Sequence, residues 1–267
     1  MEMQAYQRSW ESLPEEILLH IFSGLHDFDS LEVASLVCSS WHQASLNRTC
    51  WDPLQISDHN AFLSSLIKEE ETPKDPMHRL NQKALFVVRR CGSRAKSVSA
   101  RSCVDDAILR EIAQRCPSIE SLSLRDCTKV SGKALCQMLR IWKELKFVDL
   151  RGSNCLSTEA IEEIEGTCPN LEGLNYGGSI SYEMAEAIGK KFPNLKWLNI
   201  SGSGIDGSGL RCIMESCRDL EHLNVMGCGR LILDFELSFQ ARGIHEFKFS
   251  SFNCDYDHDY DYFGYEI

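Results

Sequence analysis

Thirteen cysteines are the residues of this sequence that most readily suggest redox or metal chemistry. Their number is odd, no C-x-x-C pair occurs, and no histidine pair stands at metal-ligand spacing. The sequence also places no Ser/His/Asp triad and no Cys/His pair at an identifiable pocket. We therefore interpret the cysteines as small buried hydrophobic residues. We expect no metal, no other cofactor and no enzymatic activity.

A glycine pattern offers a second kind of chemistry. Gly202, Gly204 and Gly207 follow an expected strand and precede an expected helix, which is the arrangement of a dinucleotide-binding loop. However, the pattern lies in phase with four sibling turns that lack these glycines. A unit of about 25 residues also leaves little room for a Rossmann crossover. The interpretation as turn glycines is therefore favoured.

The elements that position these residues follow from a repeat. An apolar frame of the form L-x-x-L-x-L recurs every 24 to 26 residues, ending at Ala100, Leu124, Leu150, Tyr176, Ile200, Val225 and Phe249. Short helical patterns and helix-ending Cys-Pro or Phe-Pro pairs separate the frames. One unit cannot bury its own apolar edge, whereas stacked units form a continuous core. The pattern resembles the cysteine-containing class of leucine-rich repeats. It predicts an α/β fold, a solenoid over residues 95–252 with a parallel concave sheet.

Each frame is followed by a small side chain three residues after its last apolar position. These side chains are Cys103, Cys127, Ser153, Ser179, Ser203 and Cys228. We predict that they bond to the backbone of the turn that leaves their strand.

The first fifty residues have the apolar spacing of short helices. Ser12 and Glu15 have the spacing of a capping box, a second helix is expected from Asp29, and a third over residues 37–42. The large apolar residues exceed what so small a core requires, which indicates a hydrophobic face for a partner. The run Trp10 to Leu18, with Ile21, Phe22, Leu25, Leu31, Val37, Cys38, Trp41 and Trp51 after it, resembles the F-box.

This resemblance implies a function. F-box helices dock on a Skp-family adaptor, which links them to a cullin and its RING subunit. The repeats would then present a protein substrate for ubiquitination and degradation. The implied adaptor contacts are Leu13, Pro14, Ile17, Ile21, Leu31, Val37, Cys38 and Trp41. Ile21 and Phe22 remain open between contact and core. The alternative function is a leucine-rich-repeat interaction scaffold without a link to ubiquitination.

Alternating residues of each frame are expected to face solvent on the concave side. Arg101, Arg125 and Arg151 would form a row suited to a carboxylate or phosphate group. Large apolar side chains nearby are of the types that anchor interfaces. We predict a substrate with an acidic or phosphorylated segment beside an apolar side chain. Its other contacts would be Phe147, Asp149, Asn175, Trp197, Asn199, His222, Asn224 and Met226. Alternatively, the arginines pair locally with Asp126 and Asp149.

The expected domain organisation has five parts. These are a flexible segment over 1–9, the F-box over 10–52, a first strand and helical connector over 53–94, the solenoid over 95–252 and an acidic disordered tail over 253–267. The net charge of −11 opposes nucleic-acid binding. No apolar run is long enough for a membrane span, and the first residues lack the features of a secretory signal. We therefore expect the protein in the nucleus, the cytoplasm or both.

Overall fold

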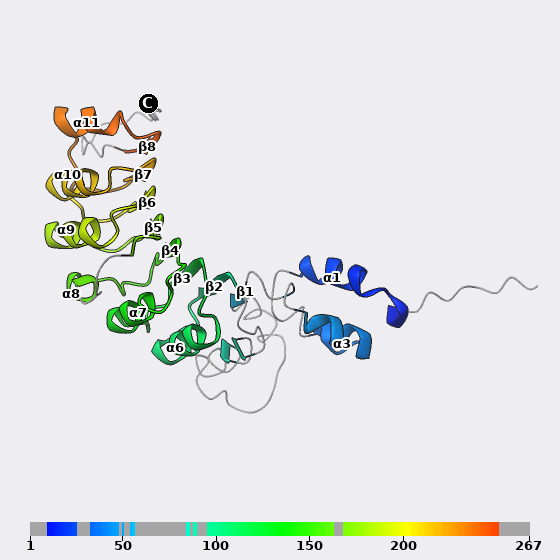
Figure 1. Cartoon of the computed structure of the whole chain (residues 1–267). Coiled ribbons are helices and arrows are strands. Elements are labelled where there is room, and N and C mark those ends of the chain that lie inside the picture. Colours follow the sequence, from blue (N-terminus) through cyan, green and yellow to red (C-terminus); the bar gives the residue numbers. More distant parts are fainter. Residues whose placement is uncertain are drawn as a thin grey trace, which may run out of the picture.

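The computed structural model describes residues 10–25, 33–47, 50, 54–56, 84–85, 88–89, 95–162 and 168–250. Within these ranges an eight-stranded sheet runs in chain order from β1 to β8, and every neighbouring pair is parallel. Figure 1 shows the strands along the inner side of a curve and helices α6 to α11 stacked along its outer side. The predicted solenoid with a concave parallel sheet is confirmed.

The elements have the following bounds. The strands are β1 (Leu54–Ile56), β2 (Ser97–Arg101), β3 (Ser121–Arg125), β4 (Phe147–Asp149), β5 (Gly173–Asn175), β6 (Trp197–Asn199), β7 (His222–Asn224) and β8 (Glu246–Lys248). The helices are η1 (Trp10–Ser12), α1 (Glu15–Ser23), α3 (Ser39–Ser45), α6 (Asp106–Arg115), α7 (Gly132–Leu139), α8 (Thr158–Glu162), α9 (Tyr182–Lys191), α10 (Gly207–Ser216) and α11 (Phe235–Ala241).

The apolar frame produces the sheet because alternate residues of a strand point to opposite faces. In β2 and β3 the buried residues are Val98, Ala100, Leu122 and Leu124, and Val98 pairs with Leu122 and Ala100 with Leu124. The same register continues to β8, where Leu223 pairs with Phe247. Equivalent residues of successive repeats therefore lie side by side, so a column in the sequence becomes a row across the concave face.

The turn after several strands requires a left-handed backbone. Gly152, Gly202 and Gly227 have φ values of +76°, +73° and +71°, and Ser102 and Asp126 occupy the same region in earlier repeats. This conformation favours glycine because it has no Cβ. Gly202 therefore has the role of its siblings. The helix start after it is already capped, since Asp206 accepts from the backbone N–H of Gly209 at 2.9 Å. The glycines form a turn, and a carboxylate occupies the place that a pyrophosphate would need.

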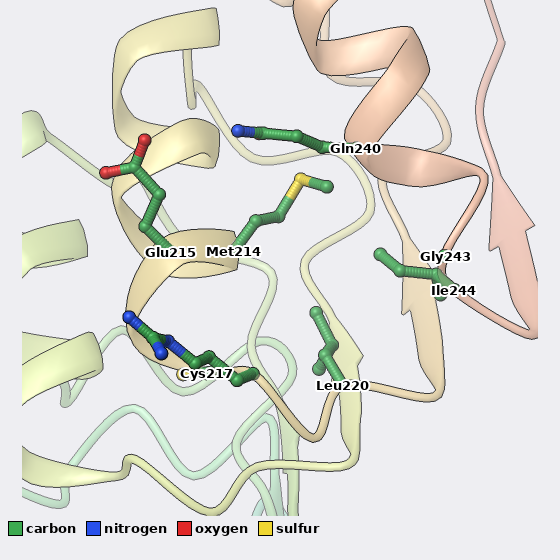
Figure 2. Close-up of a pocket in the computed structure, with 8 residues that line it drawn as sticks. Met214, Glu215, Cys217, Leu220, Gln240, Gly243 and Ile244 are labelled. Carbon is green, nitrogen blue, oxygen red and sulfur yellow. The ribbon is translucent and has the colours of Figure 1, made fainter.

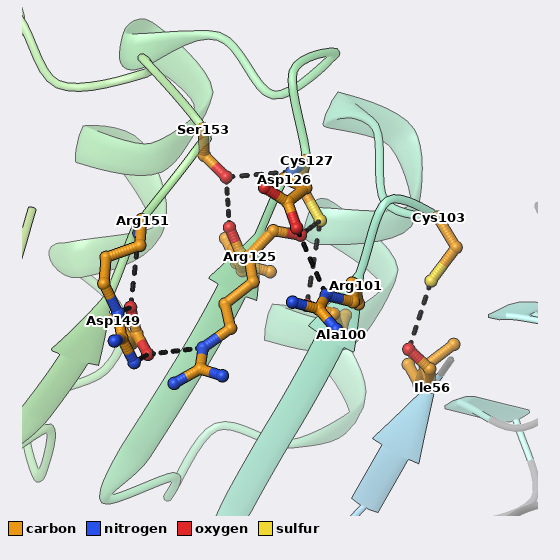
Figure 3. Close-up of polar contacts among 11 residues, drawn as sticks. Ile56, Ala100, Arg101, Cys103, Arg125, Asp126, Cys127, Asp149, Arg151 and Ser153 are labelled. Carbon is orange, nitrogen blue, oxygen red and sulfur yellow. Dashed lines mark hydrogen bonds and ion pairs between the residues drawn. The ribbon is translucent and has the colours of Figure 1, made fainter. Parts of the chain in front are cut away.

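Small side chains after several of the frames connect neighbouring repeats. Cys103 Sγ donates to the carbonyl oxygen of Ile56 at 3.2 Å, and Cys228 Sγ donates to that of Ile200 at the same distance. The Ser153 hydroxyl donates to the carbonyl of Leu124 (Figure 3). These acceptors lie at or next to the end of the preceding strand, so the predicted bond to the residue's own turn is wrong for these positions. Ser179 differs again, because its side chain is exposed.

A row of alternating charges precedes the strands and was not anticipated from the sequence. Lys96 contacts Glu120 at 3.0 Å, and Glu120 also contacts Lys146 at 2.8 Å. Glu172 and Lys196 continue the alternation at 3.6 Å. The two lysines lower the pKa of Glu120, chiefly through the hydrogen bond from Lys146. Such exposed pairs contribute only ~0–1 kcal/mol each. However, a shift of one strand along its neighbour would separate the opposite charges, so the alternation disfavours such a shift.

The N-terminal helices differ in part from expectation. Helix α1 begins after Pro14, which is its N-cap without a side-chain cap, so the capping box of Ser12 and Glu15 does not form. The reason is that a residue before proline avoids the helical region, which excludes Leu13 from the helix. Helix α3 begins at Ser39 rather than at residue 37. The Trp41 ring packs edge-on against Phe22 at 5.4 Å, and Phe22 is fully buried.

Several expectations fall on residues outside the described ranges. These are the segment 1–9, the first residues of the helix expected from Asp29, with Leu31, as well as Trp51, most of the connector and the acidic tail; residues 33–35 are described and helical. Of the connector helix, Ala84 and Val88 are described as helical and buried. Within the described ranges, every helix is too short or too polar to cross a membrane.

Candidate functional site

The concave face is divided into two parts by its chemistry. Charged side chains lie at the carboxyl ends of β2, β3 and β4, and aromatic side chains lie at the amino ends of β4, β6 and β7. The charged and the aromatic residue types do not by themselves determine these locations on the sheet. The side chains of this face alternate with buried apolar residues of the repeat frame, and those buried residues fix their direction.

The charged part contains three arginines and two aspartates (Figure 3). Arg101 Nε lies 3.1 Å from Asp126 Oδ2, and Arg125 Nε lies 2.8 Å from Asp149 Oδ2. Arg151 contacts Asp149 with two nitrogens, at 2.7 and 3.0 Å. The local pairing that the sequence left as an alternative is therefore present. It does not bury the arginines, whose side chains stay 64%, 42% and 40% exposed in the same order.

The aromatic part consists of Phe147, Trp197 and His222, here called the aromatic row. Phe147 and Trp197 are 42% and 49% exposed, unusually high for such large apolar side chains. Gly173 lies between them in the register. A Cβ at Gly173 would clash with the Phe147 ring, so this ring rests directly on the glycine backbone. Any larger residue would displace it.

Trp197 is supported by the next strand. Its ring stacks on His222 with the ring centroids 3.7 Å apart and an angle of 24° between the planes. The imidazole is in turn fixed by Glu246, whose carboxylate oxygen lies 2.7 Å from Nδ1. Glu246 also contacts Lys248, and that hydrogen bond is the main reason why the pKa of Glu246 is lowered. A chain of contacts across β6, β7 and β8 thus sets the position of an exposed tryptophan.

The asparagines between these two parts have a structural task as well. Asn199 Oδ1 accepts from the backbone N–H of Ser201 at 3.1 Å, and Asn224 Oδ1 accepts from Met226 at 3.0 Å. The side-chain oxygen therefore shapes the turn after the strand. Asn175 is half-buried on β5 and pairs with Asn199 in the register. The amide N–H groups of Asn199 and Asn224 are the atoms that remain for a ligand.

The N-terminal helices expose a second apolar surface. On α1, Leu18 and Phe22 are buried, while Ile17 on the neighbouring stripe is 48% exposed and Ile21 is half-buried. Leu13, Cys38 and Trp41 are half-buried, Pro14 is exposed, and Val37 is 53% exposed. Val33 and Leu36, at 66% and 78% exposed, add to this surface and were missed from the sequence. Their helical spacing close to Val37 was the available signal.

A groove on the helical side lies between α10 and α11 and has a volume of about 470 Å³ (Figure 2). Met214, Cys217, Leu220 and Ile244 line its apolar part. Among the residues that line the groove, the Cys217 thiol is the best candidate for a nucleophile, but burial raises its pKa to about 12. No histidine is found among the described residues that line the groove. The groove therefore offers no activated nucleophile.

Comparison with known proteins bears on the N-terminal surface first. The F-box-like family matches residues 10–54. Putative F-box/LRR-repeat protein 23 of Arabidopsis thaliana is 24% identical over 83% of this chain and 48% of its own length. F-box protein SKIP19 of the same plant is 26% identical over 95% of this chain and 80% of its own. Residues 10–54 therefore match an F-box-like domain, and most of the chain is similar to F-box/leucine-rich-repeat proteins. The chain spans about half the length of the first of these relatives.

Two further proteins are similar to this chain. Putative F-box/LRR-repeat protein 9 of Arabidopsis thaliana is 23% identical over 83% of this chain and 88% of its own length. Among solved structures, the yeast complex of Rad7 and Elc1 matches 57% of this chain and 40% of that chain, with a TM-score of 0.47 and 18% identity.

The predicted substrate-site residues of this chain fall into four groups. Arg125 and Arg151 with Asp149 form a cluster beside the pair of Arg101 and Asp126. Phe147, Trp197 and His222 form the second group, and Asn175, Asn199 and Asn224 form the third, in register on neighbouring strands. Met226 lies apart from these, two residues past the end of β7, where it is 37% exposed. Gly173, Glu246 and Asp126 support these groups and were not singled out as site residues. Gly173 had a signal, since it is the one small residue between two aromatic positions of the frame.

Proposed function

We propose that this protein is the substrate-binding, non-catalytic subunit of an SCF-type ubiquitin ligase. The observation that carries the proposal is the F-box-like match over residues 10–54 in a chain that also contains a solenoid with an open concave sheet. In this proposal the F-box helices bind a Skp-family adaptor, which connects them to a cullin and a RING subunit. The concave sheet holds a protein substrate for ubiquitination. The protein then acts in the nucleus, the cytoplasm or both.

Exposed apolar side chains support the adaptor contact. Ile17 and Val37 are each about half exposed although both are aliphatic. Burial of such a side chain stabilises a complex by ~1.5–3 kcal/mol, so a partner surface accounts for their exposure better than a free monomer does. Leu13, Pro14, Ile21, Cys38 and Trp41 are proposed to contribute to the same contact, and Leu31 is proposed with them from the sequence.

The adaptor contact is tested with the double variant Ile17→Lys/Val37→Lys. Both side chains are exposed, so the substitutions leave the core of Leu18 and Phe22 intact. We expect co-purification with the Skp-family adaptor and with the cullin to fall by about tenfold or more, as for loss of interface anchors. Glu16→Lys is the matched control, because Glu16 is exposed on a different stripe of α1.

The alternative function, a scaffold without a link to ubiquitination, gives a different result. The wild-type protein would then co-purify without the cullin, whatever its adaptor binding. Equal recovery of cullin with the wild type and the double variant would contradict the proposed contact itself.

A further inference from the structure

The charged part of the concave face carries one positive charge in excess at a defined place. Arg101 has Asp126 as a partner of its own, so this pair is neutral. Arg125 and Arg151 instead share the single carboxylate of Asp149. Two positive charges and one negative charge leave one positive charge between them. Asp149 is only 14% exposed, whereas both arginines reach solvent.

The geometry of this trio leaves donors for a second anion. Arg125 contacts Asp149 through Nε, and Figure 3 shows its two terminal nitrogens pointing away from that contact. A guanidinium group has five N–H donors, and a carboxylate accepts best from two of them at once. A ligand carboxylate beside Arg125 and Arg151 would make the trio neutral. A phosphate dianion would overshoot and leave one negative charge next to Asp149.

The aromatic row is a surface prepared for contact before any ligand arrives. Phe147 is supported by the backbone of Gly173, and Trp197 by the stacked ring of His222. Because these supports come from the protein itself, a ligand does not need to order the two rings. Binding on a preorganised surface costs less entropy. Rings that keep nearly half of their surface exposed favour a flat apolar side chain as the ligand group.

We propose that the substrate is recognised through a short extended segment with one aromatic and one acidic side chain. The aromatic side chain packs on the aromatic row, and the carboxylate of the acidic side chain bridges Arg125 and Arg151. This inference rests on the proposed function and specifies its substrate class. Phe147 begins β4, and Arg151 follows it by four residues, just past the end of that strand, so the two subsites lie about 13–16 Å apart. An extended segment covers that distance with about four or five residues.

The test uses the full chain purified with its adaptor and a set of fluorescent peptides. Each peptide carries one Phe and one Glu in a Gly-Ser background, with two to eight positions between the variable residues. We expect fluorescence anisotropy to show the tightest binding at a separation of about four or five positions, since this matches the two subsites. Trp197→Ala and Arg125→Ala are each expected to weaken the best peptide by about tenfold.

Two controls separate this inference from a general charge effect. Arg101→Ala removes a more exposed arginine that already has its own aspartate, and we expect less than about a twofold change. Gly173→Ala pushes the Phe147 ring away and should weaken Phe-containing peptides while it leaves an all-Glu control peptide unchanged. A phosphoserine in place of Glu is expected to bind no more tightly than Glu itself.

Several results would overturn the inference. One is affinity that does not depend on the Phe-Glu separation, and another is an equal loss from Arg101→Ala and Arg125→Ala. Much tighter binding of the phosphoserine peptide would refute the carboxylate. Failure of every peptide to bind a chain that still co-purifies with adaptor and cullin would refute the inference alone and leave the proposed function standing.

Discussion

Gly152 meets two demands at once, which makes it informative at the scale of single residues. Its φ of +76° lies in the left-handed region, and a Cβ at this place would clash with Asp126 Oδ1. Asp126 is the carboxylate that neutralises Arg101. The glycine therefore permits both the turn and the local ion pair beside the proposed substrate site.

Substitution at Gly152 and Gly202 should separate the two demands. Gly202 has the same backbone conformation, but a Cβ added there would meet no atom within 4 Å. We expect Gly202→Ala to lower the free energy of unfolding by about 1–2 kcal/mol through strain alone. Gly152→Ala should lower it further, because Asp126 must also move. Urea denaturation measures both values, and equal losses would contradict the role assigned to Asp126.

The buried thiols lead to a second prediction at this scale. Burial raises the pKa of Cys155 and of Cys217 to about 12. At pH 8 only about one molecule in 10,000 then carries a thiolate at either site, and the thiolate is the reactive form. We expect both residues to resist alkylation in the native protein and to react after denaturation.

Peptide mapping after brief treatment with iodoacetamide distinguishes the sites. Cys38 provides the internal comparison, because hydrogen bonding to Ser40 is the main cause of its lowered pKa and it is only half-buried. Labelling of Cys155 or Cys217 as fast as that of Cys38 in the folded protein would disprove their assignment to the core.

At the scale of elements, helix caps connect stability to pH. Asp206 caps α10, and the backbone N–H of Gly209 is the main cause that lowers its pKa below the ordinary value of 3.8. A carboxyl whose pKa is lower in the folded state stabilises the fold above the unfolded-state pKa. This stabilisation is lost as the pH falls through the folded-state pKa.

Asn and Ala substitutions at Asp206 test this cap. Asp206→Ala should cost about 1 kcal/mol of unfolding free energy at pH 7, the usual cost of losing a cap. Asp206→Asn should keep most of the cap and remove its titration. We expect the wild type to lose more stability than the Asn variant between pH 5 and pH 3 by thermal unfolding. Parallel pH profiles of these two proteins would argue against the cap as the titrating group.

Elements were also where the sequence was most informative. The apolar frame recurs regularly from Ala95 to Phe249, which was enough to place every strand from β2 to β8. Within each strand, the alternation of buried and exposed residues allows only one register. The bonds between repeats were not predictable in the same way. The Cys103 and Ser153 side chains reach the preceding strand, and that depends on the distance between repeats rather than on local spacing.

The candidate site, like the fold, was predictable from the sequence only in part. Its residues could be named, because each column of the frame becomes a row on the concave face. The sharing of Asp149 by Arg125 and Arg151 depends on side-chain rotamers and could be named only as an alternative. The close packing of Phe147 on Gly173 likewise follows from three-dimensional contact. These two details are what narrows the proposed substrate from an acidic or phosphorylated segment to an aromatic and acidic one.

At the scale of the whole molecule, the proposed function assigns different tasks to two surfaces. The F-box helices expose aliphatic side chains such as Ile17 and Val37, and the solenoid exposes the aromatic row and the arginines. The two sets come from separate elements, so each can be changed while the other is kept. A subunit that links a substrate to an adaptor requires such independence.

Proximity labelling in cells tests the central claim most directly, by comparing the wild type, Ile17→Lys/Val37→Lys, and this variant with Trp197→Ala and Arg125→Ala added. We predict that a set of proteins accumulates on the adaptor-defective variant, since it still binds substrates but does not pass them on. The same proteins should return to background when the concave substitutions are added. Identical labelling by the wild type and the adaptor-defective variant would contradict the claim that this protein is a substrate receptor of a ubiquitin ligase.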